Sequence, residues 1–331
     1  MKKTKAKTQK SVNILFTCIG RRVSLLETFR KAARSLRVKA RFLGTDTTKL
    51  SPALQLCDQR FLVKPINDAG YIKQLLSIVE SNRVRILVPT IDTELKVLAR
   101  NKKKFEDLGC RVLVSSEEVI DICQDKRQTY RFLIKHGFET PITMSAGSAL
   151  SKSNLTWPCL LKPWDGSAGK DIFIIKSRQE LAFYARKIKN AICQEYIEGE
   201  EYTCDVYVDF EKKARCAVPR KRIEVRAGEV SKSQVVKNTK IMNQAVKLVE
   251  LLDAGPGVIT LQLFLTKKHK LKFTEINPRF GGGAPLSIKA GANFPKWILQ
   301  ELLGKPTNIE FEDFTGGLIM LRYDSEVWID K

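Results

Sequence analysis

The stretch VITLQLFLTKKHKLKFTEIN, residues 258–277, decides the fold of this 331-residue chain. Its apolar halves, 258–265 and 271–277, are typical of β-strands, and the basic residues between them predict a hairpin loop. With a four-residue loop, Thr266 faces Leu271, and the same pairing places Gln262 directly opposite Glu275. Directly opposed side chains have Cβ atoms only about 4.5–5.5 Å apart, so Gln262 and Glu275 are expected to meet.

A patch of oxygen-bearing side chains is therefore expected on one face of this hairpin. Glu275 and Asn277 are two residues apart in a strand, so they project from the same face. Together with Gln262 they offer the hard oxygen ligands that Mg²⁺ takes. Leu271 and Phe273 are expected on that face too, and a solvated polar face would leave both of them in water. The hairpin therefore predicts a magnesium site.

A turn rich in glycine follows the second strand directly: Pro278-Arg279-Phe280-Gly281-Gly282-Gly283. The forked guanidinium of Arg279 suits a phosphoryl oxygen, and the glycines let the backbone approach a ligand closely. Three glycines alone would indicate only a flexible turn. Their position beside the predicted metal patch is what makes Arg279 a candidate functional residue.

The first third of the chain alternates apolar strands with amphipathic helices. Strands are expected at 12–18, 41–46, 85–88 and 111–114, and helices at 23–36, 71–79 and 92–105. This alternation predicts a parallel sheet of right-handed βαβ units. The first turn lacks G-x-G-x-x-G, which argues against a NAD site. Ligands of such sheets bind beyond the carboxyl ends of the strands, where five residues should gather: Gly20, Arg21, Asp46, Pro89 and Asp92.

The middle of the chain changes from helical to β-rich. A helix is expected at 125–137, where Gly137 is a natural C-terminal cap and Pro141 prevents continuation. Short strands are expected at 159–162, 172–176, 191–197, 203–210 and 214–220. The loop 164–170 resembles a phosphate-covering flap more than a Walker loop, because G-x-x-x-x-G-K-[ST] is absent. A plain β-turn is the alternative for this loop.

Residues 220–226 concentrate positive charge. If this stretch is extended, Arg220, Arg222 and Arg226 face one way and could bind a substrate carboxylate, with Arg222 as the first choice. A solvated edge strand is the alternative, since Lys and Arg also protect sheet edges. From the N-terminal third, Arg21, Asp46 and Asp92 are weaker candidates for substrate binding.

Composition restricts the class of protein. The chain carries 58 Lys and Arg against 36 Asp and Glu, and its net charge of +22 attracts anions such as nucleotides or nucleic acid. No apolar run approaches the ~18 residues that span a bilayer, and residues 1–10 lead into no signal-peptide segment. The eight cysteines include no C-x-x-C pair, so reduced thiols and a cytoplasmic location are expected.

Taken together, the motifs resemble the ATP-grasp superfamily, in the branch similar to the large subunit of carbamoyl phosphate synthetase. Each motif is modest, but their common order over nearly the whole chain is specific. They are Asp125 to Tyr130, Leu161-Lys162-Pro163, the flap Gly166 to Lys170, Gln194 to Glu201, Gln262, and Glu275 to Gly283.

The resemblance implies a fold class of α/β and α+β type. A parallel βαβ (pre-ATP-grasp) domain would precede an ATP-grasp fold of two α+β subdomains that clasp ATP. The expected segments are a basic disordered tail at 1–11, the pre-ATP-grasp domain at 12–115, a helical linker and the start of the ATP-grasp region at 116–155, a lid subdomain at 156–200, and a C-terminal subdomain at 201–331.

The resemblance also implies roles for single residues. ATP would be bound by Lys126 and Lys162 at the phosphates, by Gly166, Ser167 and Gly169 of the flap, by Gln194, Glu195 and Ile197 at the adenine edge, and by Glu201 at the ribose. Two Mg²⁺ ions, for which Mn²⁺ can substitute, would be held by Gln262, Glu275 and Asn277. Arg279 and Lys162 would be catalytic. Without the resemblance, Lys126 would pass as a solvated helix residue, Lys162 as a strand-end lysine and Glu201 as part of a turn.

The implied activity is ATP-dependent ligation, in which a small carboxylate is activated as an acyl phosphate and joined to an amine. A second hypothesis is an enzyme that forms carbamoyl or carboxy phosphate from bicarbonate and ammonia, because Gln262 resembles that branch where many relatives carry an acid. A third is a basic nucleic-acid-binding protein, which the ordered motifs disfavour. No membrane partner is expected, and a homodimer stays open.

Overall fold

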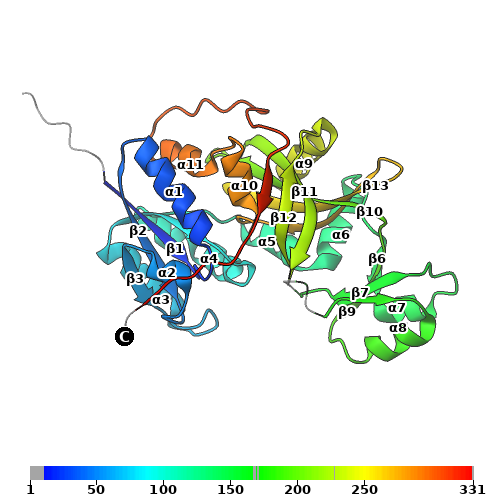
Figure 1. Cartoon of the computed structure of the whole chain (residues 1–331). Helices are drawn as coiled ribbons and strands as arrows, with labels where there is room; N and C mark the ends of the chain where they lie inside the picture. The colour runs from blue at the N-terminus through cyan, green and yellow to red at the C-terminus, as the bar shows by residue number, and fades with distance from the viewer. Residues whose placement is uncertain (1–10, 167–168, 170, 227, 330–331) are drawn as a thin grey trace, which may run out of the picture. The chain divides into compact units, whose positions relative to one another are not determined.

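The chain folds into two compact units. The computed structural model, drawn in Figure 1, describes residues 11–166, 169, 171–226 and 228–329. Unit 1 contains Met1–Val114, Asn293–Ile309 and Asp324–Lys331, and unit 2 contains Ser115–Ala292 and Glu310–Tyr323. The tail expected at 1–11, except Ser11, and the flap residue Ser167 lie outside the described residues.

Unit 1 is built on a parallel sheet, as the alternating pattern predicts. Among the described residues it has five strands in the order β3-β2-β1-β4-β5. Their bounds are Ser11–Thr17 for β1, Lys39–Asp46 for β2, Gln59–Leu62 for β3, Val84–Pro89 for β4 and Arg111–Val112 for β5. The edge strand β3 was not expected from the sequence, because its alternation of half-buried and exposed residues is short and weak.

The described helices of unit 1 are α1 at Val23–Ser35, α2 at Pro52–Gln55, α3 at Tyr71–Ser81, α4 at Asp92–Asp107 and α11 at Phe294–Leu302. Three of them, α1, α3 and α4, bury the apolar stripes that predicted them, whereas α2 and α11 were not expected. Helix α11 packs on α1 within this unit. The segment expected as one subdomain at 201–331 is therefore divided, since residues 293–309 fold with the N-terminal part of the chain.

The core of unit 1 contains a buried acid. Glu94, on α4, is completely buried. One carboxylate oxygen accepts a hydrogen bond of 2.8 Å from Thr17 Oγ1, and the other accepts one of 2.6 Å from Tyr71 Oη. Burial raises the pKa of Glu94 to about 7, although the two hydroxyl donors oppose this rise. The acid is thus satisfied by neutral partners.

Unit 2 is built on an antiparallel sheet whose described strands run in the order β14-β13-β10-β11-β12-β15. The strands are β10 at Gly199–Val208, β11 at Ala214–Arg226, β12 at Glu229–Val235, β13 at Gly257–Thr266, β14 at Leu271–Asn277 and β15 at Ile319–Leu321. Four helices accompany the sheet in the described part of this unit: α5 at Glu117–Gln124, α6 at Lys126–Lys135, α9 at Thr239–Leu251 and α10 at Ala284–Lys289.

The register of the β13–β14 hairpin confirms the central pairing predicted from the sequence. Gln262 lies opposite Glu275. The loop, however, is one residue shorter than expected, because the Thr266 N–H donates to Lys270 O at 3.0 Å. The register then shifts between Gln262 and Leu263. One extra residue in β14, Thr274, therefore forms a bulge that restores the predicted pairing.

Because of the bulge, the side chains that share a face differ from those expected from the sequence. Leu271 and Phe273 were expected beside Glu275, but both are buried opposite Leu265 and Leu263. Because side chains alternate along a strand and Thr274 adds one step, Glu275 projects from the other face. The argument that apolar neighbours would protect the polar patch was therefore wrong.

A smaller four-stranded sheet, in the order β6-β9-β7-β8 among the described residues, makes up the part of unit 2 that was expected to be the lid, and we keep that name for it. Its strands are β6 at Thr143–Ser145, β7 at Cys159–Pro163, β8 at Phe173–Ile175 and β9 at Ala191–Glu195. Figure 1 shows α7 (Ala146–Ser151) and α8 (Arg178–Ala185) beside it. Ala149, Leu161, Ile175 and Leu181 form a common core, so the lid has its own apolar interior.

The cysteines and the helices agree with two expectations from composition. All eight cysteines are free, and all except Cys18 are buried. Within the described part of the chain, no helix is long and apolar enough to cross a membrane.

Candidate active site

The predicted metal residues lie on one face of the large sheet, on β13 and β14. Gln262 lies opposite Glu275, and two residues further along β14, Asn277 lies opposite Thr260. The half-buried side chains of Gln262 and Glu275 form no hydrogen bond or ion pair with another residue that the structure describes. Oxygen atoms without partners at this depth fit a hard cation.

The chemistry of the donor set limits how strongly it can bind. Among described residues, no group of three or more His, Cys, Asp or Glu side chains could hold a metal ion. The predicted set contains one carboxylate and two amides, and amide oxygens carry no charge. Phosphate oxygens and water would therefore have to complete the coordination of Mg²⁺.

Two lysines from different elements face this patch. Lys162, at the end of β7, is 8% exposed and forms no hydrogen bond with a described residue. Burial lowers its pKa to about 8, repulsion from Lys126 adds to the shift, and Glu275 and Glu201 oppose it. A buried ammonium group without an acceptor favours an anionic ligand.

Lys126 is placed by the cap of helix α6. Asp125 caps this helix by accepting from the Arg127 N–H at 2.9 Å. The Lys126 N–H donates to Trp164 O at 3.0 Å, and its side chain donates to Gly166 O. These bonds tie the start of α6 to the flap, which brings Lys126 toward Lys162.

Glu201 and Arg222 form an ion pair across neighbouring strands. Arg222 Nε lies 3.3 Å from Glu201 Oε2, and the Arg222 side chain is only 9% exposed. Burial raises the pKa of Glu201 in spite of Arg222, and nearby Glu275 adds to this rise. The two residues were predicted to contact ribose and substrate respectively, and the structure brings them together.

The hinge between β9 and β10 is anchored by its glutamate. Lys272 Nζ lies 2.6 and 2.7 Å from the two carboxylate oxygens of Glu195, and the Ile142 N–H donates to Glu195 at 3.0 Å. Gln194 is 4% exposed and donates to Thr143 Oγ1 at 2.8 Å. Ile197 is also buried. The Glu195 carboxylate is thus used by the protein, and so is the Glu195 backbone N–H, which donates to Ile142 O at 2.8 Å.

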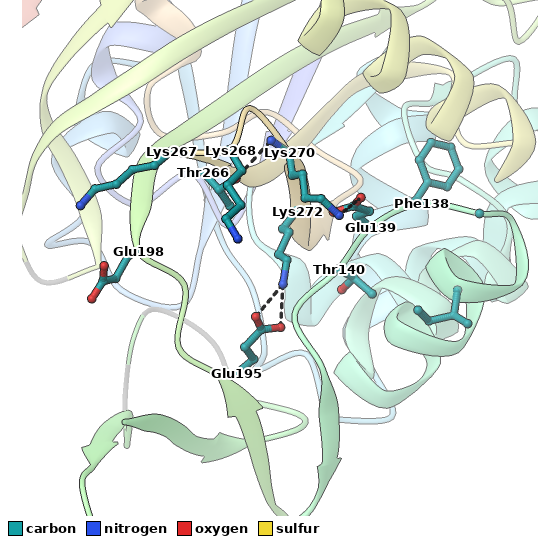
Figure 2. A pocket seen from close by; sticks show the side chains of 12 residues that line it. Phe138, Glu139, Thr140, Glu195, Glu198, Thr266, Lys267, Lys268, Lys270 and Lys272 are labelled. Carbon is teal, nitrogen blue, oxygen red and sulfur yellow. Dashed lines mark hydrogen bonds and ion pairs between the residues drawn. The ribbon is translucent and has the colours of Figure 1, made fainter. Parts of the chain in front are cut away.

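An open pocket of about 700 Å³ lies outside this hinge. Figure 2 shows Lys272 pointing down to Glu195, with the lysines of the hairpin loop above. Lys270 lies 2.9 Å from Glu139 on the opposite wall. The pocket is lined neither by Lys126 and Lys162 nor by the predicted metal ligands, so its wall stabilises the hinge and does not form the phosphate site.

The flap is described at Gly166 and Gly169. Gly169 has a φ of +70°, which few side chains tolerate, and a Cβ there would lie 3.6 Å from Gly228 Cα. The Gly166 carbonyl oxygen accepts a hydrogen bond from the Lys126 ammonium group.

Arg279 stands in the turn after β14. Its Nη1 donates to Phe280 O at 3.0 Å, and its Nη2 donates to Asn277 Oδ1 at 3.3 Å. The second bond connects the predicted phosphoryl-binding group to a predicted metal ligand. Arg279 is half-buried.

Arg220 and Arg226 differ from the expectation that they would bind substrate. Arg220 is 1% exposed, and its Nε and Nη2 donate to Asp205 at 2.8 and 3.0 Å. Arg226 is exposed and pairs with Glu224 at 2.9 Å. Asp205 was missed by the sequence analysis, because a single acid inside an apolar strand carries no motif.

The three candidates in unit 1 follow the carboxyl ends of parallel strands, as expected. Asp46 ends β2 and accepts from the Gly20 N–H at 2.9 Å and from the Thr47 N–H at 2.7 Å. Arg21 is exposed beside Gly20, and Asp92 begins α4 after β4. Asp46 therefore shapes the turn after β1.

A lysine pair, a hinge, a glycine flap and an oxygen patch lie around two antiparallel sheets, which is the arrangement that the sequence motifs led us to expect of an ATP-grasp domain. Comparison with known families agrees. Residues 14–113 match the PylC-like N-terminal domain, and residues 123–283 match the ATP-grasp domain. The chain therefore contains an ATP-grasp domain, preceded by a PylC-like N-terminal domain.

Curated relatives cover parts of the chain. A carbamoyl-phosphate synthase of Methanobrevibacter smithii is 29% identical over 167 residues, which is 49% of this chain and 44% of the relative. A D-alanine–D-alanine ligase of Thermotoga petrophila is 32% identical over 103 residues, 30% of this chain and 34% of the relative. This chain spans less than half the length of either.

Solved structures share the fold over most of the chain. The biotin carboxylase domain dimer of Hydrogenobacter thermophilus 2-oxoglutarate carboxylase, in complex with MgADP and bicarbonate, has a TM-score of 0.72 at 15% identity and covers 92% of this chain and 73% of that one. The N5-carboxyaminoimidazole synthetase of Staphylococcus aureus with ADP has a TM-score of 0.70 at 15% identity and covers 91% and 80%. At these identities the likeness establishes the fold.

Proposed function

We propose that this chain is an ATP-dependent ligase that activates a small carboxylate as an acyl phosphate and joins it to an amine. The observation that carries this proposal is a set of polar groups around one sheet face that form no hydrogen bond or ion pair with any residue the structure describes: the Lys162 ammonium group, the Gln262 amide and the Glu275 carboxylate. Such groups are costly in a folded protein unless a ligand completes them.

The nucleotide would lie between the lid and the large sheet. Lys126 and Lys162 bind the α- and β-phosphates, and the flap at Gly166 and Gly169 covers them together with Ser167. The backbone of Glu195 and Ile197, next to Gln194, meets the adenine edge, since Lys272 already occupies the Glu195 carboxylate. Glu201 accepts from the ribose hydroxyls, and Arg222 holds Glu201 for this role.

The metal site would take two Mg²⁺ ions, with Mn²⁺ as a substitute, on Gln262, Glu275 and Asn277. The ions would supply charge neutralisation on the phosphate oxygens. With a single carboxylate in the set, binding without nucleotide is expected to be weak.

The chain's own groups would promote both steps by positioning. A substrate carboxylate oxygen attacks the γ-phosphorus, the bond to the β-phosphate oxygen breaks, and ADP leaves. Arg279 stabilises the charge on the transferred group. The amine nitrogen then attacks the acyl carbon, phosphate leaves with its oxygen, and the amine loses a proton.

The substrates would contact residues beyond the phosphate site. Arg222 is the first choice to bind the substrate carboxylate, and Arg21, Asp46 and Asp92 are weaker proposals. Bicarbonate and ammonia are the second candidate pair, favoured by the likeness to carbamoyl-phosphate synthase and by the neutral Gln262. A homodimer is proposed by analogy with the dimeric biotin carboxylase domain.

The test is release of ADP and phosphate from Mg²⁺-ATP, screened against pools of amino acids and small carboxylates, and against bicarbonate with ammonia. Stimulation by a carboxylate–amine pair supports ligation, whereas stimulation by bicarbonate alone supports the second candidate. Glu275→Ala should abolish turnover. Glu139→Gln, which changes an exposed carboxylate paired with Lys270, is the matched control. Absence of both nucleotide binding and turnover would contradict the proposal, and salt-dependent nucleic-acid binding would then be examined.

A further inference from the structure

Asp205 is the centre of a buried hydrogen-bond network in unit 2. It is completely buried and lies on β10. Its oxygens accept from Arg220 Nε at 2.8 Å, Arg220 Nη2 at 3.0 Å, Thr260 Oγ1 at 3.0 Å and Ser287 Oγ at 2.7 Å. The donors come from β11, β13 and α10, so one carboxylate joins four elements.

Thr260 carries this network to the turn that holds Arg279. Its hydroxyl contacts Asp205 Oδ1 and also Arg279 O, the second at 3.1 Å. In the sheet, Thr260 lies directly opposite Asn277. The same residue therefore contacts the turn at its start and along its backbone.

The glycines of the turn are fitted against the network. A Cβ on Gly281 would lie 2.9 Å from two Thr260 side-chain atoms, and one on Gly283 would lie 2.1 Å from Arg220 Nη1. That Nη1 atom is buried and has no hydrogen-bond partner among the described residues. Arg220 thus packs its guanidinium against the turn at the cost of one hydrogen bond.

We propose that Asp205 and Arg220, acting through Thr260, are positioning residues that fix the turn from Asn277 to Gly283 and thereby the aim of Arg279. This inference rests on the proposed function, because it assigns the network to the group that stabilises the transferred phosphoryl. A network that served only stability would be equally sensitive at Thr260 and at Ser287. Both hydroxyls donate to Asp205, but only Thr260 contacts Arg279.

The experiment compares Thr260→Val with Ser287→Ala as the matched control and Thr260→Ser as the conservative rescue. The probes are MgADP alone and MgADP with fluoroaluminate, which mimics the transferred phosphoryl group. In the wild type, fluoroaluminate should tighten MgADP binding. In Thr260→Val, the tightening by fluoroaluminate should be about 10- to 100-fold smaller than in the wild type. The affinity for MgADP alone should stay within about threefold of the wild type. Ser287→Ala and Thr260→Ser should keep the tightening.

Gly281→Ala gives a second route if Thr260→Val does not fold, because the added methyl group would lie 2.9 Å from Thr260 side-chain atoms and forces the turn and Thr260 apart without removing a hydroxyl group. It should cause the same selective loss. Equal losses in Ser287→Ala and Thr260→Val, no loss in Thr260→Val, or no tightening in the wild type would overturn the inference while MgADP binding stands. Failure of the wild type to bind MgADP at all would overturn the proposed function, and the inference with it.

Discussion

The two units differ in how their buried polar side chains are satisfied. In unit 1, Glu94 is completely buried and both of its oxygens accept hydrogen bonds from hydroxyl groups of the same unit. In unit 2, Lys162 and Glu275 lie close enough to influence each other, yet neither hydrogen-bonds to a described residue. The satisfied acid has a structural role, and the unsatisfied pair indicates where a ligand belongs.

Asp205 is the exception within unit 2, since it is as well satisfied as Glu94. The energetic cost of burying the carboxyl group is offset differently in the two acids. Glu94 has neutral donors and a pKa raised to about 7 by burial, whereas Asp205 has an arginine. The difference teaches that a buried carboxyl group can be accommodated either by neutral hydroxyl donors or by a cationic partner.

The largest effect is expected from breaking the Asp205–Arg220 pair. Arg220→Leu leaves a buried carboxylate without its cation, and the free energy of unfolding should fall by about 3–5 kcal/mol. Urea denaturation would measure this loss. Arg226→Leu is the control, because Arg226 is 71% exposed in its pair with Glu224 and such pairs contribute about 0–1 kcal/mol. Similar small losses in both variants would show that burial adds nothing to the Asp205 pair.

Arg279→Ala should cause the second-largest effect, which is a loss of turnover. Removing a donor to the transferred phosphoryl group typically lowers the rate by about 10²–10³. ATP binding should stay largely intact, because the lysines and hinge that hold the nucleotide are unchanged. Steady-state kinetics with a binding titration would separate the two quantities. An equal loss of nucleotide affinity would contradict the role given to Arg279.

Glu94→Gln should remove a pH dependence of stability. The folded pKa of Glu94 is about 7, above the ordinary value of an unfolded glutamate, so the folded state retains a proton that the unfolded state releases. The unfolding free energy of the wild type should therefore fall as pH rises from about 4.5 to 7, by about 3 kcal/mol at most. Denaturation of wild type and variant at both ends of this window would test it, with the exposed Glu106→Gln as control. Parallel pH profiles for Glu94→Gln and wild type would mean that Glu94 titrates normally.

The smallest effect is expected at Lys162. Its pKa of about 8 means that the group loses charge as pH rises through 8, so MgADP affinity should fall between pH 7 and pH 9. The loss should be about tenfold, the size of a one-unit change in protonation free energy. Lys162→Arg keeps its charge throughout and should flatten the profile in a calorimetric titration. A steep profile in Lys162→Arg would assign the titration to another group.

Much of the site could be predicted from short-range pattern. The pairing of Gln262 with Glu275 was predicted correctly although the loop length was not, because the shorter loop and the Thr274 bulge offset each other. The helix cap at Asp125 and the end of β7 at Lys162 likewise follow from local signals. These features depend on residues near one another in sequence.

The two buried acids could not be predicted, for a physical reason. Glu94 lies in an amphipathic helix, where a glutamate ordinarily faces water, and its partner Thr17 is 77 residues away. Asp205 meets Thr260 only because β10 and β13 become neighbours. Strand order in an antiparallel sheet is decided by packing of the whole unit, and no local pattern records it.

The Thr274 bulge affects how the length of this hairpin can change during evolution. A four-residue loop without a bulge and the present shorter loop with one present the same Gln262–Glu275 pair at the base. An insertion at the lysine-rich tip and a deletion at Thr274 can therefore compensate each other. Related sequences are expected to differ in length at the hairpin tip. An alignment that places its gap there keeps Gln262 and Glu275 aligned with their equivalents.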